Sequence, residues 1–236
     1  MIVSLYDYTG FMLQPWAEAG FRCLAVDLLH AHNPRVESYP SGGSIEYLPI
    51  DLTDKESLTA IFDATNPKQI FAFPVCTELA GSGAKHWKLK SVEDPFFQVK
   101  AIEPITWIDE LCVSRDIPYL IENPKGLLST VWRPYDWNFS PEQYGGYLPL
   151  DDRHPLYDII PPRDAYTKET YIWARKREKP PISPVLPITV ETAGGNYSPQ
   201  FALLGGKSLK TKSIRSVTPR GFAKACFLHY KDALHA

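Results

Sequence analysis

Two stretches of the sequence end apolar runs on side chains that can do chemistry. An apolar run over residues 69–73 leads to Cys76, and the run over residues 118–121 leads to Glu122 and Asn123. A thiolate is a nucleophile, and a carboxyl group can hold or give up a proton, so this pair could support covalent catalysis. Taken alone, the cysteine could equally be a small buried residue of the core.

Three earlier apolar runs each end on an aspartate, namely Asp7, Asp27 and Asp51. Carboxylates at these points can accept hydrogen bonds from ribose hydroxyls or from an adenine amino group. They could also simply cap the helices that follow. Gly10 would let the backbone turn tightly toward a ligand. The glycine-rich dinucleotide fingerprint is absent. The aspartates therefore indicate, without fixing, an adenosine-containing cofactor.

The elements that must position these residues alternate along the first half of the chain. Segments with helical spacing over residues 11–19, 55–63 and 96–113 separate the apolar runs. This alternation predicts an α/β fold with a mostly parallel sheet and helices on both faces. Ligands of such sheets bind at the carboxyl ends of the strands, so the five polar strand ends would line one rim.

After residue 125 the alternation stops, and prolines, glycines and aromatic residues become frequent. We expect three segments. Residues 1–130 would form the catalytic and cofactor-binding domain. Residues 131–217 would form a loop-rich region that contacts the target, with a returning strand near residues 170–174. Residues 218–236 would form a C-terminal helix that packs back on the catalytic domain.

The composition excludes several function classes. The chain has 236 residues and a net charge of −2, so it is not a protein that coats nucleic acid through bulk charge. Between Thr192 and Tyr230, however, there are six Lys and Arg and no acidic residue. This stretch could contact a phosphate backbone, or it could be a solvated basic loop.

The four cysteines, at positions 23, 76, 112 and 226, form no CxxC pair and show no metal-ligand spacing. We therefore expect no disulfide framework and no metal. The sequence contains no signal peptide and no apolar run of transmembrane length, so we expect a cytoplasmic protein without a membrane partner. It does not indicate an oligomeric state.

The sequence Pro74-Val-Cys76-Thr77, followed by Glu122-Asn123, resembles the DNA cytosine-5 methyltransferases. It is most similar to their short phage and prophage type, which would place the protein in a bacterial host cell. Three further stretches carry the likeness, which runs over nearly the whole chain: FPVCTELAGSGAKHW (73–87), ENPKGLLST (122–130) and TPRGFAKA (218–225). The family's usual second proline before the cysteine is Val75 here.

The resemblance implies a Rossmann-like domain that binds S-adenosyl-L-methionine, with a small recognition region for DNA. The cofactor-binding residues that it implies are Asp7, Tyr8, Thr9, Gly10, Asp27, Leu28, Asp51, Leu52 and Pro74. The catalytic residues that it implies are Cys76, Glu122 and Asn123. Contacts to the target would come from Thr77, Ser82, Lys168 and Arg220.

The resemblance also implies a mechanism. The Cys76 thiolate would add to carbon 6 of a cytosine flipped out of the DNA, and Glu122 would hold the ring at nitrogen 3. The methyl group would then transfer to carbon 5. Two alternatives stay open. One is a pyrimidine C5 modifier that acts on nucleotides or uses an altered sulfonium donor, and the other is a catalytically inactive DNA-binding relative. The intact Cys76 and Glu122 pair argues against the inactive relative.

Overall fold

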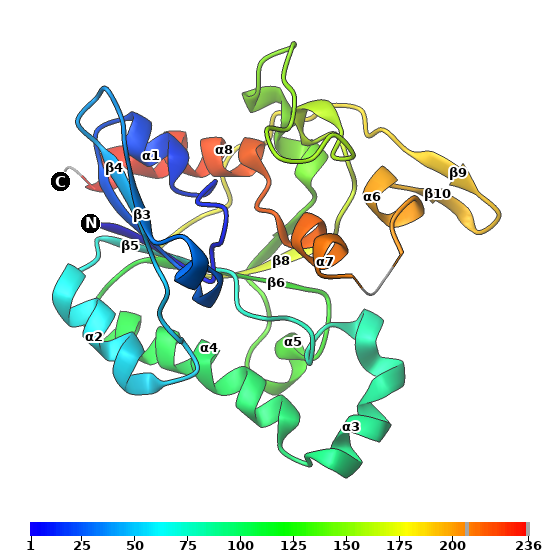
Figure 1. Ribbon diagram of the computed structural model, residues 1–236, viewed down its shortest axis with the longest axis horizontal. Coiled ribbons are helices and arrows are strands. Elements are labelled where there is room, and N and C mark those ends of the chain that lie inside the picture. The colour runs from blue at the N-terminus through cyan, green and yellow to red at the C-terminus, as the bar shows by residue number, and fades with distance from the viewer. Residues whose placement is uncertain (206–207, 235–236) are drawn as a thin grey trace. The chain divides into compact units, whose positions relative to one another are not determined.

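An eight-stranded sheet with the strand order β3-β4-β2-β1-β5-β6-β8-β7 dominates the computed structural model, which describes residues 1–205 and 208–234 (Figure 1). The strands of this sheet are β1 (Ile2–Leu5), β2 (Arg22–Val26), β3 (Arg35–Ser38), β4 (Ser44–Leu48), β5 (Gln69–Ala72), β6 (Tyr119–Pro124), β7 (Trp137–Phe139) and β8 (Thr170–Arg175). A separate antiparallel pair consists of β9 (Val190–Thr192) and β10 (Gly195–Tyr197).

The helices fall into two kinds. The α-helices are α1 (Gln14–Glu18), α2 (Lys55–Thr65), α3 (Trp87–Glu93), α4 (Phe97–Ser114), α5 (Leu128–Val131), α6 (Pro199–Ala202), α7 (Leu209–Ser216) and α8 (Arg220–Tyr230). The 3₁₀ turns are η1 (Leu28–His32), η2 (Gly81–His86), η3 (Pro141–Tyr147), η4 (Pro162–Asp164) and η5 (Lys231–Leu234).

The centre of the sheet is parallel. β1 pairs in parallel with β2 on one side and β5 on the other. β2 in turn pairs in parallel with β4, and β5 pairs in parallel with β6. Numbered along the chain, these five strands have the order 3-2-1-4-5, which is that of dinucleotide-binding folds. β3 and β8 run antiparallel to their neighbours. The predicted α/β class with a mostly parallel sheet is therefore confirmed.

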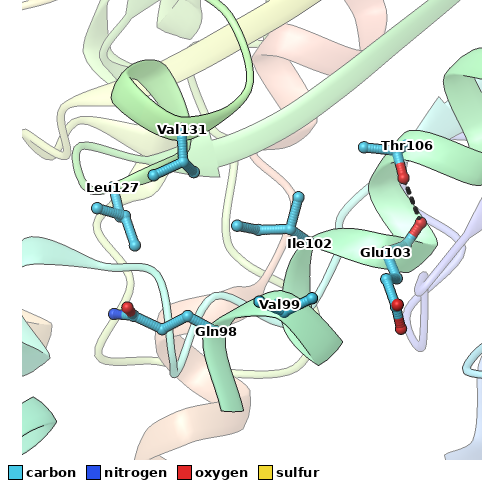
Figure 2. Close-up of a pocket in the computed structure, with 7 residues that line it drawn as sticks. All are labelled: Gln98, Val99, Ile102, Glu103, Thr106, Leu127 and Val131. Atoms are coloured by element: carbon cyan, nitrogen blue, oxygen red, sulfur yellow. Dashed lines mark hydrogen bonds between the residues drawn. The ribbon is translucent and has the colours of Figure 1, made fainter. Parts of the chain in front are cut away.

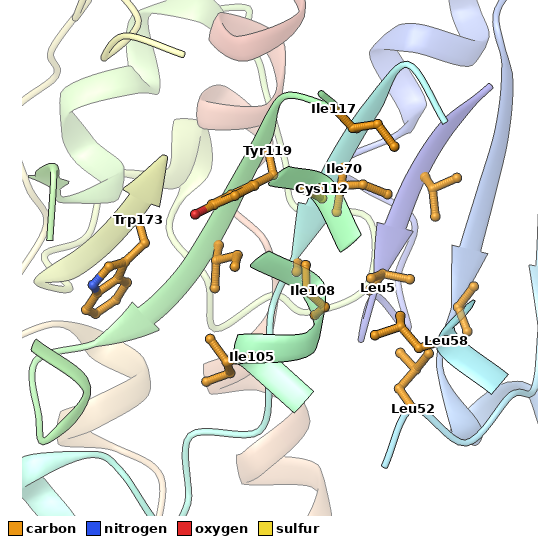
Figure 3. Packing of buried hydrophobic residues seen from close by; sticks show 14 of the residues in the cluster. Leu5, Leu52, Leu58, Ile70, Ile105, Ile108, Cys112, Ile117, Tyr119 and Trp173 are labelled. Atoms are coloured by element: carbon orange, nitrogen blue, oxygen red, sulfur yellow. The ribbon is translucent and has the colours of Figure 1, made fainter. Parts of the chain in front are cut away.

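Helices cover both faces of this sheet. On one face α2 and α4 pack on the strands, and their side chains Leu58 and Ile108 join Leu5 and Ile70 in a single buried cluster (Figure 3). On the other face Trp16 of α1 is fully buried, with its ring centroid 6.0 Å from that of Phe71. Because side chains of a strand alternate between faces, each central strand must be apolar throughout.

Local sequence signals explain where some elements begin and end. Asp54 starts α2 by accepting hydrogen bonds from the backbone of Glu56 and Ser57, and Asn66 ends it in the left-handed conformation. Pro104 predicts a kink or a break in the helix over residues 96–113, yet α4 runs through it from Phe97 to Ser114. The side chain of Pro104 is buried.

The chain divides into two compact units. The first, which we call the sheet unit, comprises Met1–Asn138 and Thr170–Glu178. The second, the loop unit, comprises Phe139–Glu169 and Lys179–Ala236. The returning strand predicted near residues 170–174 corresponds to β8 of the sheet unit, and helix α8 belongs to the loop unit. Packing of that helix against residues 1–130 stays a prediction.

The loop unit has its own core of aromatic rings. The ring of Phe222 on α8 stacks on that of Phe139 at 4.1 Å between centroids and meets the edge of Tyr144 at 5.3 Å. All three side chains are buried. The loop-rich region expected over residues 131–217 contains short regular elements, among them η3 and η4.

Candidate functional site

The cysteine and glutamate motifs lie on neighbouring strands. β5 and β6 are parallel neighbours, with Ala72 opposite Ile121. The side-chain amide of Asn123 donates a buried hydrogen bond to the carbonyl oxygen of Pro74, at 3.2 Å, and so joins the end of β6 to the segment that leads to Cys76. The two motifs predicted to act together thus meet at one edge of the sheet.

Glu122 and Asn123 lie within β6, not after its end as the sequence predicts. They pair with Ile172 and Tyr171 of β8, and this antiparallel ladder continues to Pro124. The ladder with β8 extends further along β6 than the ladder with β5 does, because the pairing with β5 stops at Ile121. The candidate acid is therefore held on a paired strand, which restricts its backbone more than a loop would.

The loop after β5 turns sharply at the candidate nucleophile. The amides of Leu79 and Ala80 donate to the carbonyl oxygen of Cys76, at 3.0 and 2.8 Å. Val75, immediately before the cysteine, is 62% exposed. The chain therefore leaves the sheet core just before Cys76, which is partly exposed.

A second loop locks this turn in place. The amide of Gly81 donates to the carbonyl oxygen of Lys125, and the amide of Leu127 donates to that of Leu79. Between them Gly126 approaches so closely that a Cβ atom there would lie 2.0 Å from the Leu79 oxygen. Only glycine fits this contact, so position 126 holds together the loops that follow β5 and β6.

The four thiols are free and differ in exposure. Cys23, Cys112 and Cys226 are buried, whereas Cys76 is partly exposed. Burial raises the pKa of the Cys23 thiol to about 12 and also raises that of Cys112. Of the four, Cys76 is the one that a reagent or a substrate can reach.

Asp7 turns inward. Its carboxylate is 2% exposed and accepts hydrogen bonds from the Ser4 hydroxyl at 2.8 Å, the Thr9 hydroxyl at 3.2 Å and the Gly10 amide at 2.8 Å. Burial raises the pKa of Asp7, against the effect of these three donors. The carboxylate therefore shapes the turn over residues 7–10 from inside.

Gly10 is required twice over. Its φ of +71° lies in the left-handed region, and a Cβ atom there would meet the hydroxyl oxygen of Tyr47 at 2.4 Å. The sequence predicts a tight turn toward a ligand at this glycine. The close neighbour in the structure is instead the ring of Tyr47, from β4.

Asp27 and Asp51 lie at the same rim and also cap turns. Asp27 accepts a hydrogen bond from the amide of Leu29, and Asp51 accepts two from Thr53. Burial raises the pKa of Tyr6, and the charges of Asp51 and Asp27 raise it further, so these three groups lie within electrostatic reach. The ends of β1, β2 and β4 thus form one cluster.

His30 joins this cluster although nothing in the sequence pattern singles it out. It is fully buried, with its Nε2 atom 3.2 Å from the carbonyl oxygen of Asp7. Its ring stacks on Tyr8 and meets the edge of Tyr47. Burial lowers the pKa of His30. The only sequence signal is its place three residues after Asp27.

The chemistry of these residues suits an adenosine group. Tyr8 and Leu28 expose apolar surface, at 45% and 57%, on which an adenine ring could rest. Asp27 and Asp51 are carboxylates of the kind that accept hydrogen bonds from hydroxyl and amino groups. Leu52 and Pro74 are buried, and their carbonyl oxygens accept hydrogen bonds from Tyr6 and Asn123.

The predicted target-binding residues divide between the units. Thr77 and Ser82 are exposed on the sheet unit, close in sequence to Cys76. Lys168 and Arg220 belong to the loop unit. The guanidinium of Arg220 makes two hydrogen bonds with the carboxylate of Asp152, at 2.8 and 2.7 Å, and is largely buried. It is therefore committed to an internal ion pair.

A pocket of about 360 Å³ opens between α4 and the segment that follows β6 (Figure 2). Gln98, Leu127 and Val131 are among its lining residues. Its wall touches the nucleophile loop, because Gln98 and Leu127 donate hydrogen bonds to the carbonyl oxygens of Glu78 and Leu79. None of the predicted site residues lines it.

Within residues 1–205 and 208–234, no cluster of three or more His, Cys, Asp or Glu is placed to hold a metal ion. No helix in the same part of the chain is long and apolar enough to cross a membrane. No protein-family model matches the sequence, and no curated protein does. The function is therefore inferred from the residues and their geometry.

Proposed function

We propose that the protein is a methyltransferase that modifies carbon 5 of cytosine in DNA through a covalent adduct with Cys76. One observation carries the proposal. Among the described cysteines, the partly exposed one is Cys76, in the loop that follows β5. β5 is the parallel neighbour of β6, which carries Glu122, and Asn123 hydrogen-bonds the two segments together. Addition to a pyrimidine ring requires a nucleophile and an acid that act on it together.

Each group has a defined task. Carbon 5 of cytosine is a poor nucleophile. When the Cys76 sulfur forms a bond to carbon 6, electron density moves toward carbon 5 and nitrogen 3. The Glu122 carboxyl group stabilises this density by holding a proton at nitrogen 3. Carbon 5 would take the electrophilic methyl group that S-adenosyl-L-methionine supplies when bound, as the bond from that methyl group to the sulfonium sulfur breaks and the neutral thioether leaves. Loss of the proton from carbon 5 to a base then expels the Cys76 thiolate and restores the double bond.

The charge distribution favours DNA as the target. The sheet unit has 14 Lys and Arg against 19 Asp and Glu, whereas the loop unit has 11 against 8. Lys210 and Lys212 on α7 are exposed, and neither forms an ion pair with a described residue. Lys207, in the same basic stretch, lies outside the described residues. A phosphate backbone is the natural partner for such a surface.

The test offers a tritium-labelled methyl donor together with duplex DNA, single-stranded DNA or free dCMP. We expect transfer to DNA, and we expect Cys76→Ser to abolish it while the buried-site control Cys23→Ala retains it. Glu122→Gln should slow transfer by about 10²-fold or more. A duplex containing 5-fluorocytosine should trap the wild-type protein covalently.

The outcomes separate the candidate functions. Transfer to dCMP alone would establish a nucleotide modifier, and transfer to none of the three would refute methylation. Transfer that persists in Cys76→Ser would refute the covalent mechanism. Binding to DNA without transfer would indicate an inactive relative.

A further inference from the structure

We propose that the ion pair between Glu78 and Lys90 positions Cys76 and tunes its reactivity. The inference rests on the proposed function in so far as it takes Cys76 as the nucleophile. Neither residue carries a chemical motif of its own. Their importance follows from where the structure places them, on the two segments that hold the cysteine in its turn.

Glu78 lies in the turn that Cys76 begins. Both of its carboxylate oxygens lie 2.6 Å from the Nζ atom of Lys90, twelve residues later on α3. The two side chains are only 27% and 34% exposed. Partial burial reduces screening by water, so this pair is stronger than a typical exposed pair. The carboxylate two residues after Cys76 is thus neutralised at short range.

The backbone of the same residue is held from another side. Gln98, in the first turns of α4, donates its side-chain amide to the carbonyl oxygen of Glu78 at 3.3 Å. Glu78 is therefore bound at its carboxylate by Lys90 of α3 and at its carbonyl oxygen by Gln98 of α4. With the Asn123 bond to Pro74, the segment around the nucleophile is fixed at both ends.

Helix α3 has little else to hold it. No residue of α3 is buried, and its apolar side chains Leu89 and Val92 are 70% and 82% exposed. Hydrophobic burial therefore contributes little to its placement. Within the described residues, Lys90 supplies the side-chain hydrogen bond that joins α3 to the turn at Cys76. Removing it would release α3 from the turn and leave the Glu78 carboxylate without its cation.

The pair also has an electrostatic consequence. A negative charge near a thiol opposes formation of the thiolate, and a nearby cation favours it. Without Lys90, the Glu78 carboxylate would act on Cys76 uncompensated. Without Glu78, the lysine would favour the thiolate. The two single substitutions should therefore change Cys76 reactivity in opposite directions, which a purely structural role would not do.

The experiment measures the rate at which iodoacetamide alkylates Cys76, located by peptide mass spectrometry, from pH 6 to pH 9.5. It needs no DNA and no methyl donor. The variants are Lys90→Met, Glu78→Gln and the charge exchange Glu78→Lys with Lys90→Glu. The matched control is Lys100→Met, which removes the more exposed ion pair to Asp94 at the junction of α3 and α4.

We expect Lys90→Met to slow alkylation near neutral pH by about 5-fold and to move its pH profile upward, since a tenfold change corresponds to one pKa unit. Glu78→Gln should move the profile downward. The exchange should return the rate to within about 2-fold of wild type, as should Lys100→Met. Shifts in the same direction for both single variants, no shift in either, or failure of the exchange to restore the rate would each overturn the proposal.

A methyl-transfer assay then distinguishes this inference from the proposed function. Lys90→Met should lower kcat and leave KM for donor and DNA within about 2-fold, because it alters the nucleophile and no binding surface. A rise in KM with no loss of kcat would contradict the proposal that Lys90 positions Cys76. If alkylation behaves as expected but the wild-type protein transfers no methyl group, the positioned thiol stands and the proposed function falls.

Discussion

In each unit of the molecule a buried aspartate accepts the amide of a glycine, locally in one case and across the fold in the other, and the two aspartates have different further partners. Asp7 in the sheet unit accepts the amide of Gly10 at 2.8 Å, and Asp164 in the loop unit accepts the amide of Gly221 at 2.9 Å. Burial raises the pKa of both. The remaining donors to Asp7 are neutral hydroxyl groups, whereas Asp164 lies 3.7 Å from the guanidinium of Arg220.

The difference follows from how each unit is built. In the sheet unit, paired strands and an apolar cluster carry the architecture, so a polar turn needs only local hydrogen bonds. The loop unit has one short β-hairpin of its own and holds its loops with a buried charge network. Arg163 and Asp164 even adopt positive φ values of 58° and 47° in succession. Surrounding contacts must stabilise such backbone.

The sharpest test of this contrast removes the central cation of the loop unit. Arg220→Met leaves Asp152 and Asp164 without their cation, and we expect it to cost about 3–5 kcal/mol because the charges are buried. Amide hydrogen exchange in α8 measures the loss. Lys55→Met in the sheet unit is the control, with hydrogen exchange measured in α2. Its ion pair to Glu110 is more exposed and should contribute about 1 kcal/mol or less. Equal losses from the two variants would remove the distinction.

Two glycines of the sheet unit, Gly10 and Gly42, test how tightly its turns are packed. Both have positive φ, but a Cβ at Gly10 meets Tyr47, whereas a Cβ at Gly42 meets nothing within 4 Å. We expect Gly10→Ala to destabilise by about 1–3 kcal/mol more than Gly42→Ala, the usual cost of overpacking.

Urea unfolding followed by tryptophan fluorescence suits this measurement, because all six tryptophans of the sequence fall within the sheet unit. Similar stabilities for the two glycine variants would show that Tyr47 moves aside without cost.

The smallest effects come from pH, and they have opposite signs. The pKa of Asp7 is raised, so the stability of wild type relative to Asp7→Asn should fall as pH rises from about 4, by at most ~1.4 kcal/mol per pH unit, and level off above the folded pKa. Burial would raise the pKa of Asp152, but its hydrogen bonds from Arg220 and Arg163 lower it. The stability advantage of wild type over Asp152→Asn should therefore persist above pH 4 and disappear below it.

Denaturant unfolding at a series of pH values measures both differences. The stability of wild type relative to Asp7→Asn could instead grow as pH rises. That result would show that the folded state stabilises the ionised carboxylate of Asp7, and it would contradict a raised pKa.

The part of the fold that could be predicted is the part set by local pattern. Short apolar runs between helical segments identify β1, β2, β5 and β6, because strands buried on both faces must be apolar throughout. The same pattern places Cys76 and Glu122 at neighbouring strands. Strand β3 (Arg35–Ser38) was not predicted, since its residues are exposed or half-buried and give no apolar run.

Side-chain partners could not be predicted in this way. The family resemblance implies that Arg220 contacts a target. Its structural partner Asp152 lies 68 residues away and becomes a neighbour only in the folded unit. The inward turn of Asp7 and the burial of His30 depend on packing around the ends of several strands. Such contacts are a property of tertiary structure, and residue type alone does not report them.

Strand β8 has a consequence for how the protein is made on the ribosome. It completes the ladder on β6, yet the residues of the loop unit between Phe139 and Glu169 must be synthesised first. At typical translation rates, about 3–10 s pass between Pro124, the last residue of β6, and Arg175, the last residue of β8. During that interval the strand with Glu122 is an open edge, able to pair with other chains. Newly made protein therefore carries an exposed strand edge at its candidate catalytic strand until β8 covers it.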